Sequence, residues 1–146
     1  MASKLNPYIS FKDTARDAME FYKDVFGGEL TVSTFGDFGG GDPGHQADPE
    51  GVMHALLETP SGFTIMASDT PPGMDYNPGS SISVSLSGDD ADELRGYWGK
   101  LSDGGTVAVP LEKQMWGDEF GMCVDKFGIG WMVNIAGEGP AGAPTP

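Results

Sequence analysis

The chain has one cysteine, few basic residues and no long apolar run. Cys123 alone excludes an internal disulfide. Eight Lys and Arg against 22 Asp and Glu give a formal net charge of −14, which argues against nucleic acid or an anionic membrane surface as partner, because both reward clustered cations. No apolar stretch approaches the roughly 20 residues that span a bilayer, and no signal peptide is recognisable. We therefore expect a soluble, cytoplasmic protein.

What the chain does contain is an internal repeat. A shift of 76 positions places Asp13 on Asp89, and one further residue brings Gly27-Gly28 onto Gly104-Gly105. Two similar halves are the simplest explanation. At 146 residues, we expect the halves to form one integrated domain with a shared core rather than two independent domains.

Each half has an amphipathic helix, recognised by apolar residues that recur every three or four positions. The first apolar face comprises Ala15, Ala18, Met19, Tyr22, Val25 and Phe26, and the second comprises Ala91, Leu94, Trp98 and Leu101. Asp89 or Asp90 is a candidate N-cap of the second helix, and Gly27 and Gly104 are the predicted stops.

A strand is predicted before each helix, and three strand-like runs follow it. The predicted strands are 8–11, 29–35, 52–58 and 63–68 in the first half and 81–86, 106–109, 119–124 and 129–135 in the second, with 110–117 a looser segment. This order predicts an α+β fold of two βαβββ modules, residues 1–70 and 80–136, joined by a proline-rich linker at 71–79 and followed by a disordered tail at 137–146.

One helix per module covers only one face of a four-stranded sheet, so the other face must meet the second module, a partner chain or a ligand. We expect a curved mixed sheet that forms a cleft, with the helices on its outer face. Residues 36–50, rich in Gly, Pro and Asp, are predicted to be a functional flap or a mobile segment. His45 in this segment is interpreted as a solvated loop histidine.

Several local motifs resemble those of one known family. They are Asn6-Pro7-Tyr8, Phe26-Gly27-Gly28, Met53-His54-Ala55, Trp116-Gly117-Asp118 and Asp125-x-Phe127-Gly128-x-x-Trp131. Together with the repeated strand and helix order, they resemble the PhnB-like branch of the vicinal oxygen chelate superfamily, a branch often mislabelled as a demethylubiquinone methyltransferase. The superfamily includes glyoxalase I, extradiol dioxygenases, fosfomycin resistance enzymes and bleomycin-binding proteins. The resemblance implies the glyoxalase/bleomycin resistance fold, and family precedent implies a homodimer, formed by side-by-side packing or by exchange of modules.

The resemblance also implies where a metal would sit. Catalytic members of the superfamily hold one divalent ion with His or Glu side chains, and the matching positions here are Asn6, Met66, Ser81 and Met132. None of these four is a strong ligand for such a cation. We therefore expect neither the superfamily metal nor another cofactor.

His54 is the candidate catalytic residue and a candidate ligand contact. It lies in a strand that is apolar on both faces, where a histidine can act as a general base, anchor a ligand or simply be a satisfied core residue. It is expected to share a face with Leu56, Glu58, Tyr8 and Met66. The full predicted ligand-binding set is Tyr8, His54, Met66, Trp116, Phe120 and Met132. For Trp116 and the methionines, core packing is the competing interpretation.

These features predict a protein that binds a small apolar or aromatic molecule; by analogy, the acidic surface suits a cationic ligand such as a glycopeptide antibiotic. Two alternatives stay open. The first is a lyase- or isomerase-type enzyme, either with a metal at His54, His45, Glu58 or Glu112 or with His54 as the base. The second is a dimeric scaffold or regulator without a pocket. Cys123 is expected to be buried and inert.

Overall fold

The computed structural model describes residues 3–38, 49–71 and 74–137. His45, most of the predicted flap and nearly all of the predicted tail lie outside the described residues. The chain divides into two compact units, residues 1–78 and 79–146, each of which is described by itself. That the modules form one integrated domain around a cleft stays a prediction.

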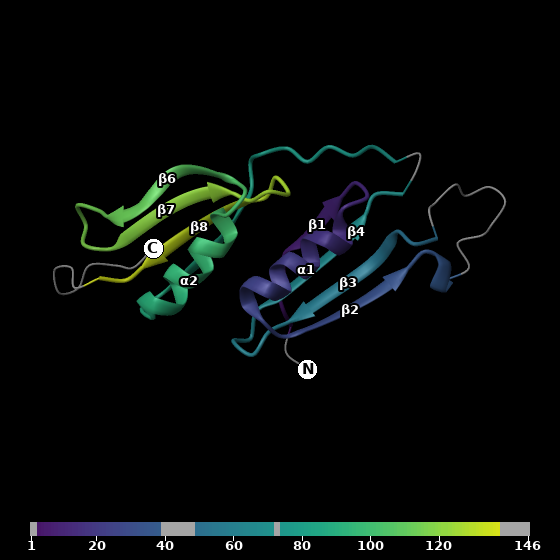
Figure 1. The fold of residues 1–146 in the computed structure, drawn as a ribbon, viewed down its shortest axis with the longest axis horizontal. Coiled ribbons are helices and arrows are strands. Elements are labelled where there is room, and N and C mark those ends of the chain that lie inside the picture. Colours follow the sequence, from purple (N-terminus) through teal and green to yellow (C-terminus); the bar gives the residue numbers. More distant parts are fainter. Residues whose placement is uncertain (1–2, 39–48, 72–73, 138–146) are drawn as a thin grey trace. The chain divides into compact units, whose positions relative to one another are not determined.

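The first unit consists of β1 (Tyr8–Phe11), α1 (Ala15–Phe26), β2 (Glu29–Thr34), a 3₁₀ turn η1 (Gly36–Phe38), β3 (Val52–Glu58) and β4 (Thr64–Asp69). The second consists of β5 (Ser83–Gly88), α2 (Ala91–Ser102), β6 (Thr106–Lys113), β7 (Glu119–Val124) and β8 (Gly130–Ile135). Two βαβββ modules were predicted, and the α+β fold class is confirmed (Figure 1).

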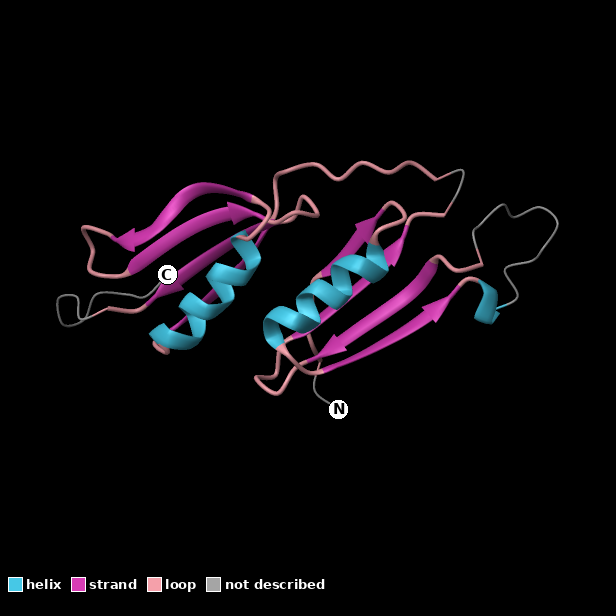
Figure 2. Ribbon diagram, in the orientation of Figure 1, coloured by secondary structure: helices cyan, strands magenta, loops and turns pink. Residues whose placement is uncertain are grey.

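Both sheets have the same topology. The strand order is β1-β4-β3-β2 in the first and β5-β8-β7-β6 in the second. The first and last strands of each module, β1 with β4 and β5 with β8, pair in parallel, and the other neighbours are antiparallel. In each unit, the helix covers one face of its own sheet (Figure 2). The opposite face is called the open face below.

The predicted apolar face of α1 is confirmed, since all six of its residues are buried. They pack on Ala55, Leu57, Ile65 and Ala67 of β3 and β4, which are also buried. The prediction for α2 is partly wrong. Leu94, Tyr97 and Leu101 are its buried residues, whereas Trp98 is only half-buried.

Trp98, although only half-buried, contacts the sheet of its own unit. A Cβ added to Gly121 in β7 would lie 2.8 Å from Cη2 of Trp98. The indole ring therefore reaches the backbone of β7 at a position where only glycine leaves room. Helical periodicity alone cannot predict such a contact, because it is made with a strand that lies far along the chain.

Most strand boundaries agree with the prediction, but two do not. β5 begins at Ser83 rather than at residue 81, and β6 continues from Thr106 to Lys113 although residues 110–117 were predicted to be loose. Pro110 fits inside β6 because this strand lies at the sheet edge. There, a residue without a backbone N–H need not remove a hydrogen bond between strands. The register of β6 shifts on both sides of Val109, as β-bulges allow.

The repeated glycine pairs have a common cause. A Cβ on Gly28 would overlap the carbonyl oxygen of Glu58, and a Cβ on Gly105 would overlap that of Val124. Both glycines begin the chain's return from the helix, and each passes against the end of the third strand of its module. The sequence repeat therefore marks one close backbone approach that occurs in both units.

Candidate functional site

Three candidate residues lie together on the open face of the first unit. Tyr8 pairs with Met66, and Met66 pairs with Leu56, so the three side chains point to one side of the sheet. The alternate positions Ala55 and Ala67 are fully buried beneath α1. Tyr8 is 50% exposed, and Met66 and Leu56 are half-buried. This face therefore presents apolar surface away from the helix.

His54 belongs to the same group. Its Nδ1 atom lies 3.3 Å from the hydroxyl oxygen of Tyr8, within hydrogen-bonding distance, and the two ring centroids are 5.8 Å apart. Which partner donates depends on the histidine tautomer. The expectation that Tyr8, His54 and Met66 share a face is confirmed. Glu58 follows on the same side of β3 and is exposed.

The other three candidates lie in the second unit. Met132 pairs with Met122 across β8 and β7 and with Ser85 across β8 and β5. Phe120, two positions before Met122, points to the same side. The ring of Trp116 follows, with its centroid 6.4 Å from that of Phe120. Trp116 is 47% exposed, so core packing is not its main role.

A further residue on this open face, Asn134, was not among the sequence candidates. It pairs with Phe120 and Ser87, and it is only 3% exposed. Its Nδ2 donates to Asp118 Oδ2 at 3.0 Å, but its Oδ1 is buried and has no donor within the described part of the chain. The available sequence signal was an asparagine two positions after Met132 in an otherwise apolar strand.

Asp118 joins this asparagine to the following segment. Its Oδ2 accepts from Asn134 Nδ2, and its Oδ1 accepts from the backbone N–H of Gly137 at 2.9 Å. These two hydrogen bonds, first that from Asn134, hold the pKa of the Asp118 carboxyl below its usual value of 3.8. The Asp118 side chain is therefore buried and hydrogen-bonded.

The donor atoms do not fit the superfamily metal. Asn6 and Ser81 each lie two residues before the first strand of their unit, and Met66 and Met132 lie within the last strands. Amide, hydroxyl and thioether groups are weak ligands for hard or borderline divalent ions. Within residues 3–38, 49–71 and 74–137, no group of three or more His, Cys, Asp or Glu side chains is arranged to hold a metal ion.

Cys123 is buried in β7, as predicted. Burial, and secondly the nearby Asp125 carboxylate, raise the pKa of its thiol to about 11. The thiolate that would react or bind metal is therefore scarce at neutral pH. Trp131, 1% exposed, is a core residue, and its Nε1 donates to Asp125 Oδ2 at 2.8 Å.

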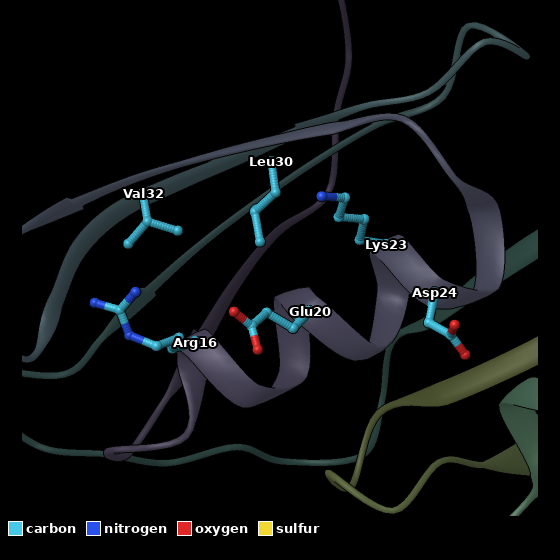
Figure 3. A pocket seen from close by; sticks show the side chains of 6 residues that line it. All are labelled: Arg16, Glu20, Lys23, Asp24, Leu30 and Val32. Atoms are coloured by element: carbon cyan, nitrogen blue, oxygen red, sulfur yellow. The ribbon is translucent and has the colours of Figure 1, made fainter.

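A separate groove of about 660 Å³ lies between α1 and β2 (Figure 3). It is lined by Arg16, Glu20, Lys23, Asp24, Leu30 and Val32. None of the sequence candidates contributes to it, since it is on the helix side of the sheet.

None of the helices that the structure describes has the length and apolar character needed to cross a membrane.

Comparisons with known proteins agree with the architecture. Residues 3–134 match the family described as 3-demethylubiquinone-9 3-methyltransferase. Protein PA1353 from Pseudomonas aeruginosa is 36% identical, with a TM-score of 0.79, over 92% of this chain and 98% of that chain. The chain belongs to this family. The match confirms the branch expected from the motifs, the one that carries the demethylubiquinone methyltransferase label.

More distant structures share the fold. The PhnB protein from Bacillus cereus is 22% identical, with a TM-score of 0.73, over 92% of this chain and all of that chain. A glyoxylase/bleomycin resistance protein/dioxygenase domain from Frankia is 14% identical, with a TM-score of 0.61, over 93% and 98%. At these identities the likeness extends to the fold alone.

Proposed function

We propose that this PhnB-like protein binds a small apolar or aromatic molecule on the open faces of its sheets, without the superfamily metal. The observation that carries the proposal is the Tyr8–His54 hydrogen bond beside Met66 in the first unit. A polar pair on an apolar, partly exposed surface is what a binding site needs to orient a ligand. If Tyr8 and His54 only stabilised the core of the first unit, they would be expected on the other side of the sheet, beneath α1.

The second unit supports the same kind of ligand. Trp116 and Phe120 offer flat aromatic surface, and Met132 an adaptable thioether. The buried Oδ1 of Asn134, which lacks a donor within the described residues, suits a ligand that carries an N–H or O–H group. The net charge of −14 favours a cationic or neutral ligand over an anion.

Isothermal titration calorimetry with a panel of cationic and neutral aromatic compounds tests this proposal. For any compound that binds, Tyr8→Phe and His54→Leu should each raise Kd by about tenfold, because each removes one partner of the hydrogen bond. Thr14→Ala is the matched control, since Thr14 is exposed at the start of α1, on the helix side of the sheet, and its side chain makes no cap. Binding that both variants leave unchanged would contradict the proposed site, and no binding across the panel would contradict the function.

The Tyr8–His54 pair also favours a second candidate, a lyase- or isomerase-type activity with His54 as the base. A neutral imidazole that is oriented by a phenol hydroxyl can remove a proton from a bound carbon acid. Hydrogen–deuterium exchange of carbonyl compounds, followed by NMR in D₂O, would detect this step. Exchange that depends on His54 would make the protein an enzyme, whereas binding without exchange leaves a ligand-binding protein.

A further inference from the structure

The groove between α1 and β2 has an apolar floor that the helix leaves uncovered. Leu30 of β2 pairs with Leu57 of β3, and Val32 pairs with Ala55. Paired residues point to the same side of a sheet, so all four side chains lie on the helix side. Leu57 and Ala55 are fully buried, whereas Leu30 and Val32 are only half-buried. Since α1 packs mainly over β3, the edge strand β2 keeps apolar surface open beside the helix.

The charged residues of the groove all come from α1. They are two cations and two acids, so the lining has no formal net charge, and all four are exposed: Arg16, Glu20, Lys23 and Asp24. Figure 3 shows Glu20 between Arg16 and Lys23 along the helix. Lys23 lies beside Leu30, Arg16 lies beside Val32, and Asp24 points away from the apolar floor (Figure 3).

Glu20 and Lys23 do not neutralise each other through an ion pair. Within residues 3–38, 49–71 and 74–137, the ion pair that forms is Arg95–Glu119 in the second unit. A carboxylate and an ammonium group on the surface gain little from pairing with each other, because water solvates both well. Glu20 and Lys23 are therefore available to a ligand that carries the opposite charges.

Arg16, by contrast, already lies among other acids. It also borders a smaller hollow of about 160 Å³, whose acidic lining is Asp13, Asp17, Glu50 and Asp69. Hydrogen bonds from Thr34, and more weakly the charge of Arg16, lower the pKa of the Asp37 carboxyl. Of the two cations that line the groove, Lys23 is therefore the better partner for an anionic group.

We propose that this groove binds an apolar α-amino acid, with its ammonium group at Glu20 and its carboxylate at Lys23. Its side chain lies over Leu30 and Val32. Glu20 and Lys23 are three positions apart on α1, so their Cβ atoms are roughly 5–6 Å apart. Both charged groups of an amino acid are attached to one carbon, so the two residues can contact both at once. An ion of one sign would meet the like charge of the other residue.

An amino acid also suits the charge of the chain and the size of the groove. The formal net charge of −14 repels anions, whereas a zwitterion has no net charge to be repelled. The volume of the groove, about 660 Å³, is within the range of small-molecule sites. The half-buried floor favours a ligand with an apolar side chain, which removes the remaining apolar surface from water. This site is on the helix side of the sheet and is independent of the open faces.

Calorimetry with L-leucine, leucinamide and 4-methylpentanoate tests the charge matching. Leucinamide lacks the carboxylate and 4-methylpentanoate lacks the ammonium group, so wild type should bind leucine at least about tenfold more tightly than either. Glu20→Gln should remove the preference over 4-methylpentanoate, and Lys23→Gln should remove the preference over leucinamide. Asp17→Asn and Lys12→Gln change exposed residues that do not line the groove; they are the matched controls and should keep both preferences.

Methyl NMR locates the bound amino acid. Leucine should shift the methyl signals of Leu30 and Val32 and leave those of Met66, on the open face, and Leu101, fully buried in the second unit, unchanged. Leucine that shifts neither Leu30 nor Val32, or that binds no more tightly than its two singly charged analogues, would overturn the proposal. Neither result bears on ligand binding at the open faces, which are on the other side of the sheets.

Discussion

The two helices begin in different ways. In α1, Thr14 makes no side-chain cap; the N–H of Ala15 instead donates to Oδ1 of Asp69, at 2.9 Å, from 54 residues further along the chain. The other oxygen of Asp69 accepts from the N–H of Val52, also at 2.9 Å. In α2, Asp90 accepts locally from the N–H of Glu93 at 3.1 Å.

This difference shows that a repeated sequence does not imply a repeated way of stabilising the fold. The buried Asp69 joins the start of α1 to β3 and β4, so the helix of the first unit depends on its sheet. Asp90 is exposed and serves its own helix alone. The start of α1 should therefore be more sensitive than the start of α2 to the loss of its carboxylate.

The largest effect is expected for Asp69→Ala. It leaves the N–H groups of Ala15 and Val52 without their acceptor in a buried place, which should lower the free energy of unfolding by about 4 kcal/mol. Urea unfolding followed by circular dichroism measures the change. Asp75→Ala, at an exposed acid of the same unit, is the control and should have little effect. A loss below about 1 kcal/mol would show that water replaces the carboxylate.

Asp90→Ala should have a smaller effect, about 1 kcal/mol, which is typical of an N-cap at an exposed helix start. Asp90→Asn keeps an acceptor oxygen and should recover most of the loss. Both variants are compared with wild type by the same urea titration. Equal losses for Asp69→Ala and Asp90→Ala would remove the distinction between the two units.

A smaller, pH-dependent effect is expected at Asp118 in the second unit. Its pKa is lowered in the folded state by the hydrogen bonds from Asn134 and Gly137. The stabilisation is therefore present above the unfolded value of 3.8 and is lost as the pH falls through the lower folded value. The Tm of Asp118→Asn should accordingly fall less than that of wild type between about pH 5 and pH 3. Parallel Tm profiles would contradict this role.

Features with a local cause could be predicted from the sequence. The face of α1 follows from helical periodicity, and β1 and β3 follow from short apolar runs. The side of the sheet on which Tyr8, His54 and Met66 lie follows from alternation along each strand together with the repeated module order, which brings β1 beside β4. Helix stops at glycine pairs are equally local. The residues on the open face of the first unit could therefore be predicted from the sequence.

Features that depend on distant contacts were missed. Trp98 reaches the backbone of β7 at Gly121, and Pro110 continues a strand because that strand is at an edge. The role of Asp69 at the start of α1 spans 54 residues. Asn134 was missed because its burial and its unmatched acceptor arise only when β8 meets Asp118.

The most direct test of the ligand-binding account is NMR of ¹³C-methyl-labelled methionines with a compound that binds in calorimetry. Met66 and Met132 lie on the open faces, whereas Met19 is fully buried on the sheet-facing side of α1 and is the internal reference. The account predicts that saturating compound shifts the methyl signal of Met66, that of Met132, or both, and leaves Met19 unchanged. Bound compound that shifts neither open-face methionine would contradict it.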